Sequence, residues 1–290
     1  MKIGYFPGCT LHSSAREFDK SLKAVAEPLG IDLVEVQDWG CCGATSAHAT
    51  NHLLSIALPA RTLALAEEQG IERLLVPCAA CYSRMATANH EMIHDEEMKA
   101  KVEDAIERTY SGSVEVVSIT EFLRDIAPTI KEKVSQSLSD VQVACYYGCL
   151  LLRPPEIHTY DDTEDPNSME SITKATGAKP VSWNMRLECC GGGFSIPRTG
   201  SVVRLGRSIL EDALEAGAQA VVLACPMCHS NLDLRQKAMA KRSDKEMMVP
   251  ILYITQLVGL ALGLDPAALD LKRHFVKTMP FVQEINTKAG

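Results

Sequence analysis

The sequence predicts an α/β protein of two pseudo-symmetric, Rossmann-like repeats, each a parallel sheet flanked by helices. Three observations indicate this fold: a cysteine pattern that occurs twice, a short apolar run before each cysteine motif, and a helical pattern after it. Apolar runs without strict alternation are typical of strands buried on both faces, and strands that alternate with helices indicate a parallel sheet. Because such sheets bind ligands at the carboxyl ends of their strands, we expect a cysteine-rich site at that edge of each repeat.

The repeat is defined by ten of the eleven cysteines. In the first half they are Cys9, Cys41, Cys42, Cys78 and Cys81. In the second half they are Cys149, Cys189, Cys190, Cys225 and Cys228. The offset between the halves is 140 residues at the first cysteine and 147 or 148 at the others, so we expect a small insertion before the second cysteine pair, such as the polar segment 160–169. Repetition this regular indicates a duplicated domain.

Each element of the predicted repeat follows from a local pattern. First-half strands are expected in KIGYF, IDLVEV, RLLVP and the start of 114–126. Second-half strands are expected in VQVACYY, KPVSWN, AVVLA and the start of 249–263. Helical patterns over 51–70 and 202–217 end on glycine, a common residue at helix C-termini. We therefore expect one domain over 1–138, a second over 139–264, and a C-terminal tail over 265–290 outside both repeats.

Composition excludes several classes of protein. The net charge is −8 and no basic run offsets it, which argues against a nucleic-acid partner. The first ten residues lack the apolar core of a secretory signal. The longest apolar stretch, 249–264, is shorter than the roughly 20 residues of a spanning helix. We therefore expect a cytoplasmic protein without a membrane span, and no nucleotide-binding glycine motif occurs in the chain.

The adjacent cysteines point to metal chemistry. Neighbouring Cα atoms lie about 3.8 Å apart, closer than the roughly 4.4 to 6.8 Å of a relaxed disulfide, and clustered cytosolic thiols stay reduced. Zinc takes four ligands, and so does a cubane [4Fe-4S] cluster. Five convergent cysteines therefore favour a cluster in which one thiolate bridges two irons, or a set in which one cysteine is not a ligand. Zinc remains an alternative.

Four further features bear on this hypothesis. The stretch CPMCH, residues 225–229, matches a c-type haem attachment pattern, but its first-half equivalent is CAACY. A thioredoxin-like CxxC pair would leave the CCG motifs unexplained. Cys145 lies within a predicted strand and has no equivalent in the first half, where residue 5 is Tyr, so we interpret it as a core residue. None of the eight histidines repeats at a motif.

Two copies of the order Cys, Cys-Cys-Gly and Cys-x-x-Cys resemble the CCG-domain (cysteine-rich) iron–sulfur family, over roughly residues 1 to 264. Within the family the chain is most similar to the B subunit of heterodisulfide reductase. Its length fits, YFPGC and YYGCLLLRP have the expected form, and no ferredoxin-type cysteine run is fused to it.

The resemblance implies that each five-cysteine set holds a non-cubane [4Fe-4S] cluster, with no flavin, NAD or haem in this chain. It implies a catalytic subunit that reduces the disulfide of coenzyme M and coenzyme B to two thiols during methanogenesis. Electrons would arrive from a small ferredoxin-like C subunit of the reductase complex, which a flavin-containing A subunit supplies. Such a substrate carries a sulfonate and a phosphate, so arginines are expected near the site, and Arg198 is a candidate.

Two rival functions remain open. The chain could be an iron–sulfur electron-transfer subunit of a flavin-dependent lactate, glycolate, fumarate or succinate oxidoreductase. It could also be a zinc-stabilised structural or assembly protein. The tail from Asp265 onward could contribute to an interface with a partner.

Overall fold

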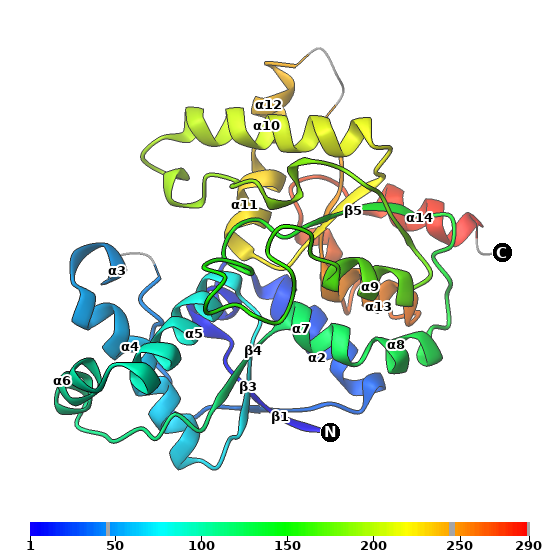
Figure 1. Ribbon diagram of the computed structural model, residues 1–290. Coiled ribbons are helices and arrows are strands. Elements are labelled where there is room, and N and C mark those ends of the chain that lie inside the picture. The colour runs from blue at the N-terminus through cyan, green and yellow to red at the C-terminus, as the bar shows by residue number, and fades with distance from the viewer. Residues whose placement is uncertain (45–46, 244–246, 289–290) are drawn as a thin grey trace.

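The protein contains two four-stranded parallel sheets, one in each half of the chain (Figure 1). The structure is a computed structural model that describes residues 1–44, 47–243 and 247–288. The strand order is β2-β1-β3-β4 in the first sheet and β6-β5-β7-β8 in the second. Both sheets follow the same order along the chain, so the prediction of two parallel-sheet repeats is confirmed.

The strands match the predicted apolar runs. The first sheet contains β1 (Lys2–Tyr5), β2 (Asp32–Glu35), β3 (Arg73–Val76) and β4 (Glu115–Ser118). The second contains β5 (Gln142–Tyr146), β6 (Lys179–Pro180), β7 (Ala220–Leu223) and β8 (Ile251–Tyr253). Every residue of β7 and β8 is buried, because helices cover both faces of a parallel sheet. Strand β6 is shorter than predicted. The N–H groups of Lys179 and Val181 donate to the carbonyls of residues 141 and 143 at 2.8 Å and 2.9 Å, but the next carbonyl of β5, that of Cys145, accepts from the indole of Trp183 at 3.1 Å and not from a backbone N–H.

Helices follow the strands in both halves. In the first half they are α1 (Gly8–His12), α2 (Arg16–Leu29), α3 (Ala47–Thr50), α4 (His52–Glu68), α5 (Ala79–His94), α6 (Glu96–Ile106), α7 (Ile119–Asp125) and α8 (Ala127–Lys133). In the second they are α9 (Ser168–Ala175), α10 (Thr199–Glu215), α11 (Pro226–Leu234), α12 (Gln236–Ala240), α13 (Ile254–Ala261) and α14 (Met279–Lys288). Short 3₁₀ turns cover Met185–Leu187, Gly192–Phe194 and Leu271–Arg273. The predicted helices over 51–70 and 202–217 are α4 and α10.

The two halves interlock through equivalent elements. Helix α13, which follows the last strand of the second half, packs on α2, and α7, which follows the last strand of the first half, packs on α9 (Figure 1). Thr120 and Tyr160 are joined by a 2.8 Å hydrogen bond, and Thr255 and Ser21 by one of 2.7 Å. Thr120 and Thr255 occupy the same position in their halves, two residues after β4 and β8. The contacts between the halves are therefore reciprocal.

Aromatic rings cross the same boundary. Phe18 of α2 stacks on Tyr253 with centroids 4.2 Å apart, and Tyr253 stacks in turn on His229 at 4.4 Å. In the other direction His158 packs on Tyr82 at 4.9 Å. Phe18 and His158 each lie nine residues after the first cysteine of their half, and Tyr82 and His229 each follow the last one. One ring from each half thus reaches the neighbourhood of the other half's cysteines.

The C-terminal tail packs against both halves. Leu269 and Leu271 are fully buried. Asp233 of α11 accepts backbone hydrogen bonds of 2.7 Å and 3.0 Å from residues 275 and 276. Arg273 pairs with Glu17 of the first half at 3.2 Å. The tail is therefore part of the core, and none of the helices in the described ranges has the length and apolar character needed to cross a membrane.

Candidate functional site

The cysteine motifs begin where strands end. Cys78 lies two residues after β3 and caps α5, and Cys225 lies two residues after β7 and caps α11. Cys9 and Cys149 likewise follow β1 and β5 within four residues. Because the strands of each sheet are parallel, these ends meet at one edge. The topology thus brings the five motif cysteines of each half together.

Within each half the thiols contact one another in the same pattern. Cys42 and Cys81 have Sγ atoms 3.1 Å apart, and their equivalents Cys190 and Cys228 have them 3.3 Å apart. The remaining side-chain contacts pair Cys9 with Cys41, Cys78 with Cys81, Cys149 with Cys189 and Cys225 with Cys228. The structure therefore gathers all ten motif cysteines into two sets of five.

The eleventh cysteine, Cys145, lies apart from both sets. Its side chain is fully buried in β5, where its Sγ lies 3.3 Å from the hydroxyl of Thr173. Burial raises the pKa of the Cys145 thiol well above its ordinary value, so this residue packs as a small apolar side chain.

The glycine of each CCG motif turns a backbone amide toward the first cysteine of the pair. Gly43 donates to Cys41 Sγ at 3.4 Å, and Gly191 donates to Cys189 Sγ at 3.3 Å. Both glycines have positive φ, +73° and +80°, a conformation that side chains disfavour. The motif therefore needs glycine for its backbone shape as well as for space.

A second pair of glycines clears space beside the sulfurs. A Cβ added to Gly8 would lie 3.1 Å from Cys81 Sγ, and one added to Gly148 would lie 3.4 Å from Cys228 Sγ. Both residues also have positive φ, +65° and +66°. At this position, which we call the glycine face, Gly8 or Gly148 presents a hydrogen atom and no side chain to the sulfur of the last cysteine. That arrangement suits a bulky inorganic core.

Hydrogen bonds between the thiols separate their pKa values. The hydrogen bond with Cys81 lowers the pKa of Cys42 to about 7, and the same contact raises the pKa of Cys81. In the second half the hydrogen bond with Cys149 lowers the pKa of Cys189 to about 5 and raises that of Cys149. One sulfur of each pair is thereby favoured as a thiolate, the form that binds metals.

The two sets differ in the polar side chain beside the cysteine pair. Asn231 is buried, and its amide nitrogen lies 3.4 Å from the carbonyl oxygen of Cys190 and 3.6 Å from its Sγ. Arg84 occupies the equivalent position, three residues after the last cysteine, and its positive charge contributes to the lowered pKa of Cys42. Sequence reasoning missed both residues, although aligning the two CxxC motifs places them in register.

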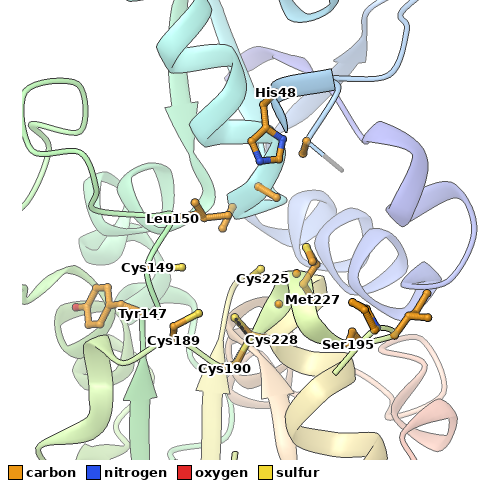
Figure 2. A pocket seen from close by; sticks show the side chains of 17 residues that line it. His48, Tyr147, Cys149, Leu150, Cys189, Cys190, Ser195, Cys225, Met227 and Cys228 are labelled. Atoms are coloured by element: carbon orange, nitrogen blue, oxygen red, sulfur yellow. Dashed lines mark hydrogen bonds between the residues drawn. The ribbon is translucent and has the colours of Figure 1, made fainter. Parts of the chain in front are cut away.

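The second set opens on a cavity of about 490 Å³ between the two halves (Figure 2). Its lining includes five cysteines, namely Cys149, Cys189, Cys190, Cys225 and Cys228. The first half contributes Ala79 and Ala80 from the start of α5, together with Ala44 and His48. Figure 2 shows His48 on the side of the cavity opposite the cysteines. The cavity therefore lies where a ligand could touch the second set and the first half at once.

The cavity lining is mainly apolar. Leu150, Ile196, Pro197 and Met227 complete much of the wall, and the described lining residues include no arginine or lysine. Arg198 is exposed as the residue before α10 and is not part of the lining. A ligand with several negative charges would therefore find few cationic partners among these side chains.

A second buried group of potential metal ligands is satisfied without an ion. His229, Asp233 and His274 lie close together, but Asp233 already accepts two backbone hydrogen bonds. His229 Nε2 lies 3.0 Å from His274 Nδ1, and the amide of Gln256 donates to His274 Nε2 at 2.9 Å. This group stabilises the tail against α11 and β8.

The cysteine sets suit an iron–sulfur cluster better than zinc. Five sulfurs exceed the four ligands of a structural zinc site, and the glycine faces leave room for a bulky core. Fold and site together define a class, two-domain α/β proteins with a duplicated cysteine-rich cluster site. The cysteine-rich domain called CCG matches residues 3–86 and 143–233, and the chain belongs to this family.

Relatives of nearly the same length support an iron–sulfur oxidoreductase subunit. The chain is 35% identical to the 8-methylmenaquinol:fumarate reductase membrane anchor subunit of Wolinella succinogenes, over 95% of this chain and 97% of that protein. It is 31% identical to the B subunit of the ferredoxin/F420H2-dependent CoB-CoM heterodisulfide reductase of Methanosarcina acetivorans, over 98% and 97%. A hypothetical protein from Helicobacter pylori has the same fold, with a TM-score of 0.78 at 14% identity over 95% of this chain and 52% of that one.

Proposed function

We propose that this chain holds one non-cubane [4Fe-4S] cluster in each five-cysteine set and that its substrate reacts in the cavity beside the second set. One observation carries the proposal: the cysteines of the second set line a cavity that also reaches the first half. When bound, the two clusters would each exchange one electron with a two-electron substrate. The ligands would be Cys9, Cys41, Cys42, Cys78 and Cys81 in one set, and Cys149, Cys189, Cys190, Cys225 and Cys228 in the other.

The first candidate substrate is the disulfide of coenzyme M and coenzyme B, which would be reduced to two thiols. The relatives named as B subunits of heterodisulfide reductases support it. In this chain His48 would face the substrate from the first half, and Ser195 offers a hydroxyl at the cavity wall. Ser195 is held in place because Asn231 accepts its hydroxyl proton at 2.9 Å.

The second candidate is an apolar electron carrier such as a quinol, with the chain serving a fumarate or succinate oxidoreductase. The apolar lining favours it, because burying apolar surface stabilises binding by about 25 cal/mol per Å² while an unpaired buried charge is costly. The name of the Wolinella succinogenes relative, which belongs to a methylmenaquinol:fumarate reductase, agrees with this choice. In either role the chain would work in the cytoplasm and take its electrons from, or pass them to, cluster- or flavin-containing partner proteins.

The deciding experiment starts with metal analysis of protein purified without oxygen. We expect about eight irons with matching sulfide and little zinc per chain, as two [4Fe-4S] clusters require. One or two zincs with little iron would overturn both candidates.

The second step measures the EPR spectrum of the oxidised protein with the coenzyme M thiol or with a short-chain menaquinol. A change caused only by the thiol supports the disulfide, and a change caused only by the quinol supports the second candidate. Arg198→Ala serves as a control in both arms. Because Arg198 lies outside the cavity lining, we expect the variant to respond as the wild type does.

A further inference from the structure

Tyr253 is a buried tyrosine whose hydroxyl has no hydrogen-bond partner among the described residues. The residue is fully buried at the end of β8. Its ring is held between Phe18 of the first half, at 4.2 Å, and His229 of the second, at 4.4 Å. The two stacked rings fix the plane of the phenol, so its hydroxyl cannot swing out to solvent.

Other buried tyrosines are satisfied. The hydroxyl of Tyr5 donates to Asp19 at 2.6 Å, that of Tyr110 to Asn89 at 2.6 Å, and that of Tyr146 to the carbonyl of residue 188 at 2.5 Å. A buried polar group left unpaired loses its hydrogen bonds to water without replacement, which destabilises the fold. The partner of Tyr253 is therefore expected to be an atom that is not part of the polypeptide's own hydrogen-bond network.

The position of Tyr253 indicates which atom that is. In the sheet register Tyr253 lies beside Leu223, two residues before Cys225. Burial raises the pKa of Tyr253 well above its ordinary value, and the nearby charges of Glu17, Cys225 and Cys78 raise it further. Glu17 already pairs with Arg273. His229, on which Tyr253 stacks, donates its backbone N–H to the carbonyl oxygen of Cys225 at 2.9 Å. The phenol therefore lies beside the turn that carries Cys225 and Cys228, in the second half.

The equivalent residue of the first half offers no such group. Ser118 ends β4 as Tyr253 ends β8, and its hydroxyl accepts the backbone N–H of Glu121 at 3.0 Å within its own helix cap. The phenol is therefore a feature of the second half alone.

We propose that the Tyr253 hydroxyl donates a hydrogen bond to a sulfur of the second cluster, beside Cys225, when that cluster is bound, and so raises the reduction potential of that cluster. Hydrogen bonds to cluster sulfurs are among the determinants of cluster potential, because a donor stabilises the more negative, reduced form. This deepens the proposed function and rests on the second set holding a cluster. Tyr253 is a positioning and tuning residue.

The test compares Tyr253→Phe with wild type in anaerobically purified, cluster-loaded protein. We expect unchanged iron per chain, a lower midpoint potential for one cluster in an EPR-monitored redox titration, and loss of one exchangeable-deuteron coupling in pulsed EPR after transfer to D2O. Tyr110→Phe is the matched control, because it also removes the hydroxyl of a buried tyrosine, but one whose partner is Asn89. We expect it to change neither the potential nor the coupling.

A second variant covers the case in which Tyr253→Phe does not fold. Fluorotyrosine incorporated at position 253 makes the phenol a stronger donor with little change in size, so the potential should move upward. Full iron content with no shift in either variant overturns the inference. Low iron in the wild type itself overturns instead the proposal that the sets hold clusters.

Discussion

The two cysteine sites share one backbone and differ in the side chains that surround it. Both have a close pair of sulfurs at 3.1 or 3.3 Å, a glycine amide on the first cysteine of the pair, and a glycine face beside the last one. Around that common frame the first site has Arg84 where the second has Asn231. The second set lines the cavity of about 490 Å³ between the halves.

This comparison separates what binding a cluster requires from what using it requires. The strand ends, sulfurs and glycines repeat because they set the geometry of the ligands. The guanidinium of Arg84, the amide of Asn231 and the unpaired phenol of Tyr253 do not repeat. Such groups change the charge around a cluster and its reduction potential. We therefore expect the first cluster to store and relay electrons and the second to meet the substrate.

The largest expected effect comes from removing one ligand at each site. Cys78→Ser and Cys225→Ser should each lose about half of the iron, since a [4Fe-4S] cluster needs its thiolates, but only Cys225→Ser should abolish the EPR response to substrate. Cys145→Ala is the control and should keep all iron, because Cys145 lies in the core of β5. Equal loss of the response in both serine variants would remove the distinction between the sites.

The next largest effect concerns His158, which packs on Tyr82 of the other half, and the stability of the protein at acidic pH. Burial and the Arg84 cation lower the pKa of His158 to about 4, below the roughly 6.5 of an unfolded histidine. The unfolded chain then binds more protons between these values, so stability present above about pH 6.5 is lost as the pH falls toward 4. We expect His158→Phe, which copies Phe18, to reduce that loss by about 3 kcal/mol.

Urea unfolding at pH 7 and at pH 4.5 measures the difference. The reciprocal variant Phe18→His should become more acid-sensitive than the wild type. If His158→Phe loses as much stability on acidification as the wild type does, His158 is not the group responsible.

Replacing Gly8 or Gly148 with alanine should have a smaller effect on stability and iron content. Gly8→Ala and Gly148→Ala each place a side chain at positive φ, at a cost of about 1–2 kcal/mol. Gly8→Ala should also lower the iron content more, because its Cβ meets Cys81 Sγ at 3.1 Å and Phe6 at 3.2 Å, closer than the 3.4 Å at Gly148. Gly200→Ala lies in the first turn of α10, where no atom lies within 4 Å of the added Cβ. It should keep all iron and have an unchanged or slightly raised melting temperature, because alanine favours a helix over glycine.

The smallest effect concerns the polar residue beside each pair. Arg84→Asn makes the first site resemble the second, and we expect its cluster potential to fall by on the order of 40 mV, which corresponds to about 1 kcal/mol for one electron. Redox titration of the variant measures the shift. An unchanged or raised potential would show that Arg84 does not stabilise the reduced form.

The repeated motifs made the scaffold predictable from sequence. Strand ends, the CCG pair and the CxxC helix cap depend on local patterns that recur at a constant offset, so their convergence followed from parallel topology alone. The length of strand β6 was overestimated because the indole of Trp183, and not a backbone N–H, donates to the next carbonyl of β5, a side-chain contact that an apolar run does not report.

The surroundings of the sites depend on contacts between the halves, which no local pattern reports. Tyr253 stacks on Phe18 of the other half, and the apolar cavity arises between residues more than 100 positions apart, such as Ala79 and Cys225. Asn231, by contrast, contacts Cys190 within its own half, and aligning the two CxxC motifs indicates it. Arg198 was a candidate because it is close to the second CCG in sequence, yet the chain turns it outward at the start of α10.

The reciprocal contacts between the halves also bear on how such a chain could arise. The packing of α13 on α2 and of α7 on α9 is what a two-fold symmetric pair of identical chains would show, because each element then meets its counterpart's partner. A single-repeat ancestor would therefore have been a homodimer. Because one sequence would have encoded both of its sites, any substitution would have changed both. Fusion of the two copies removed that symmetry, so that one site could acquire an asparagine and an unpaired phenol while the other kept an arginine and a capped serine.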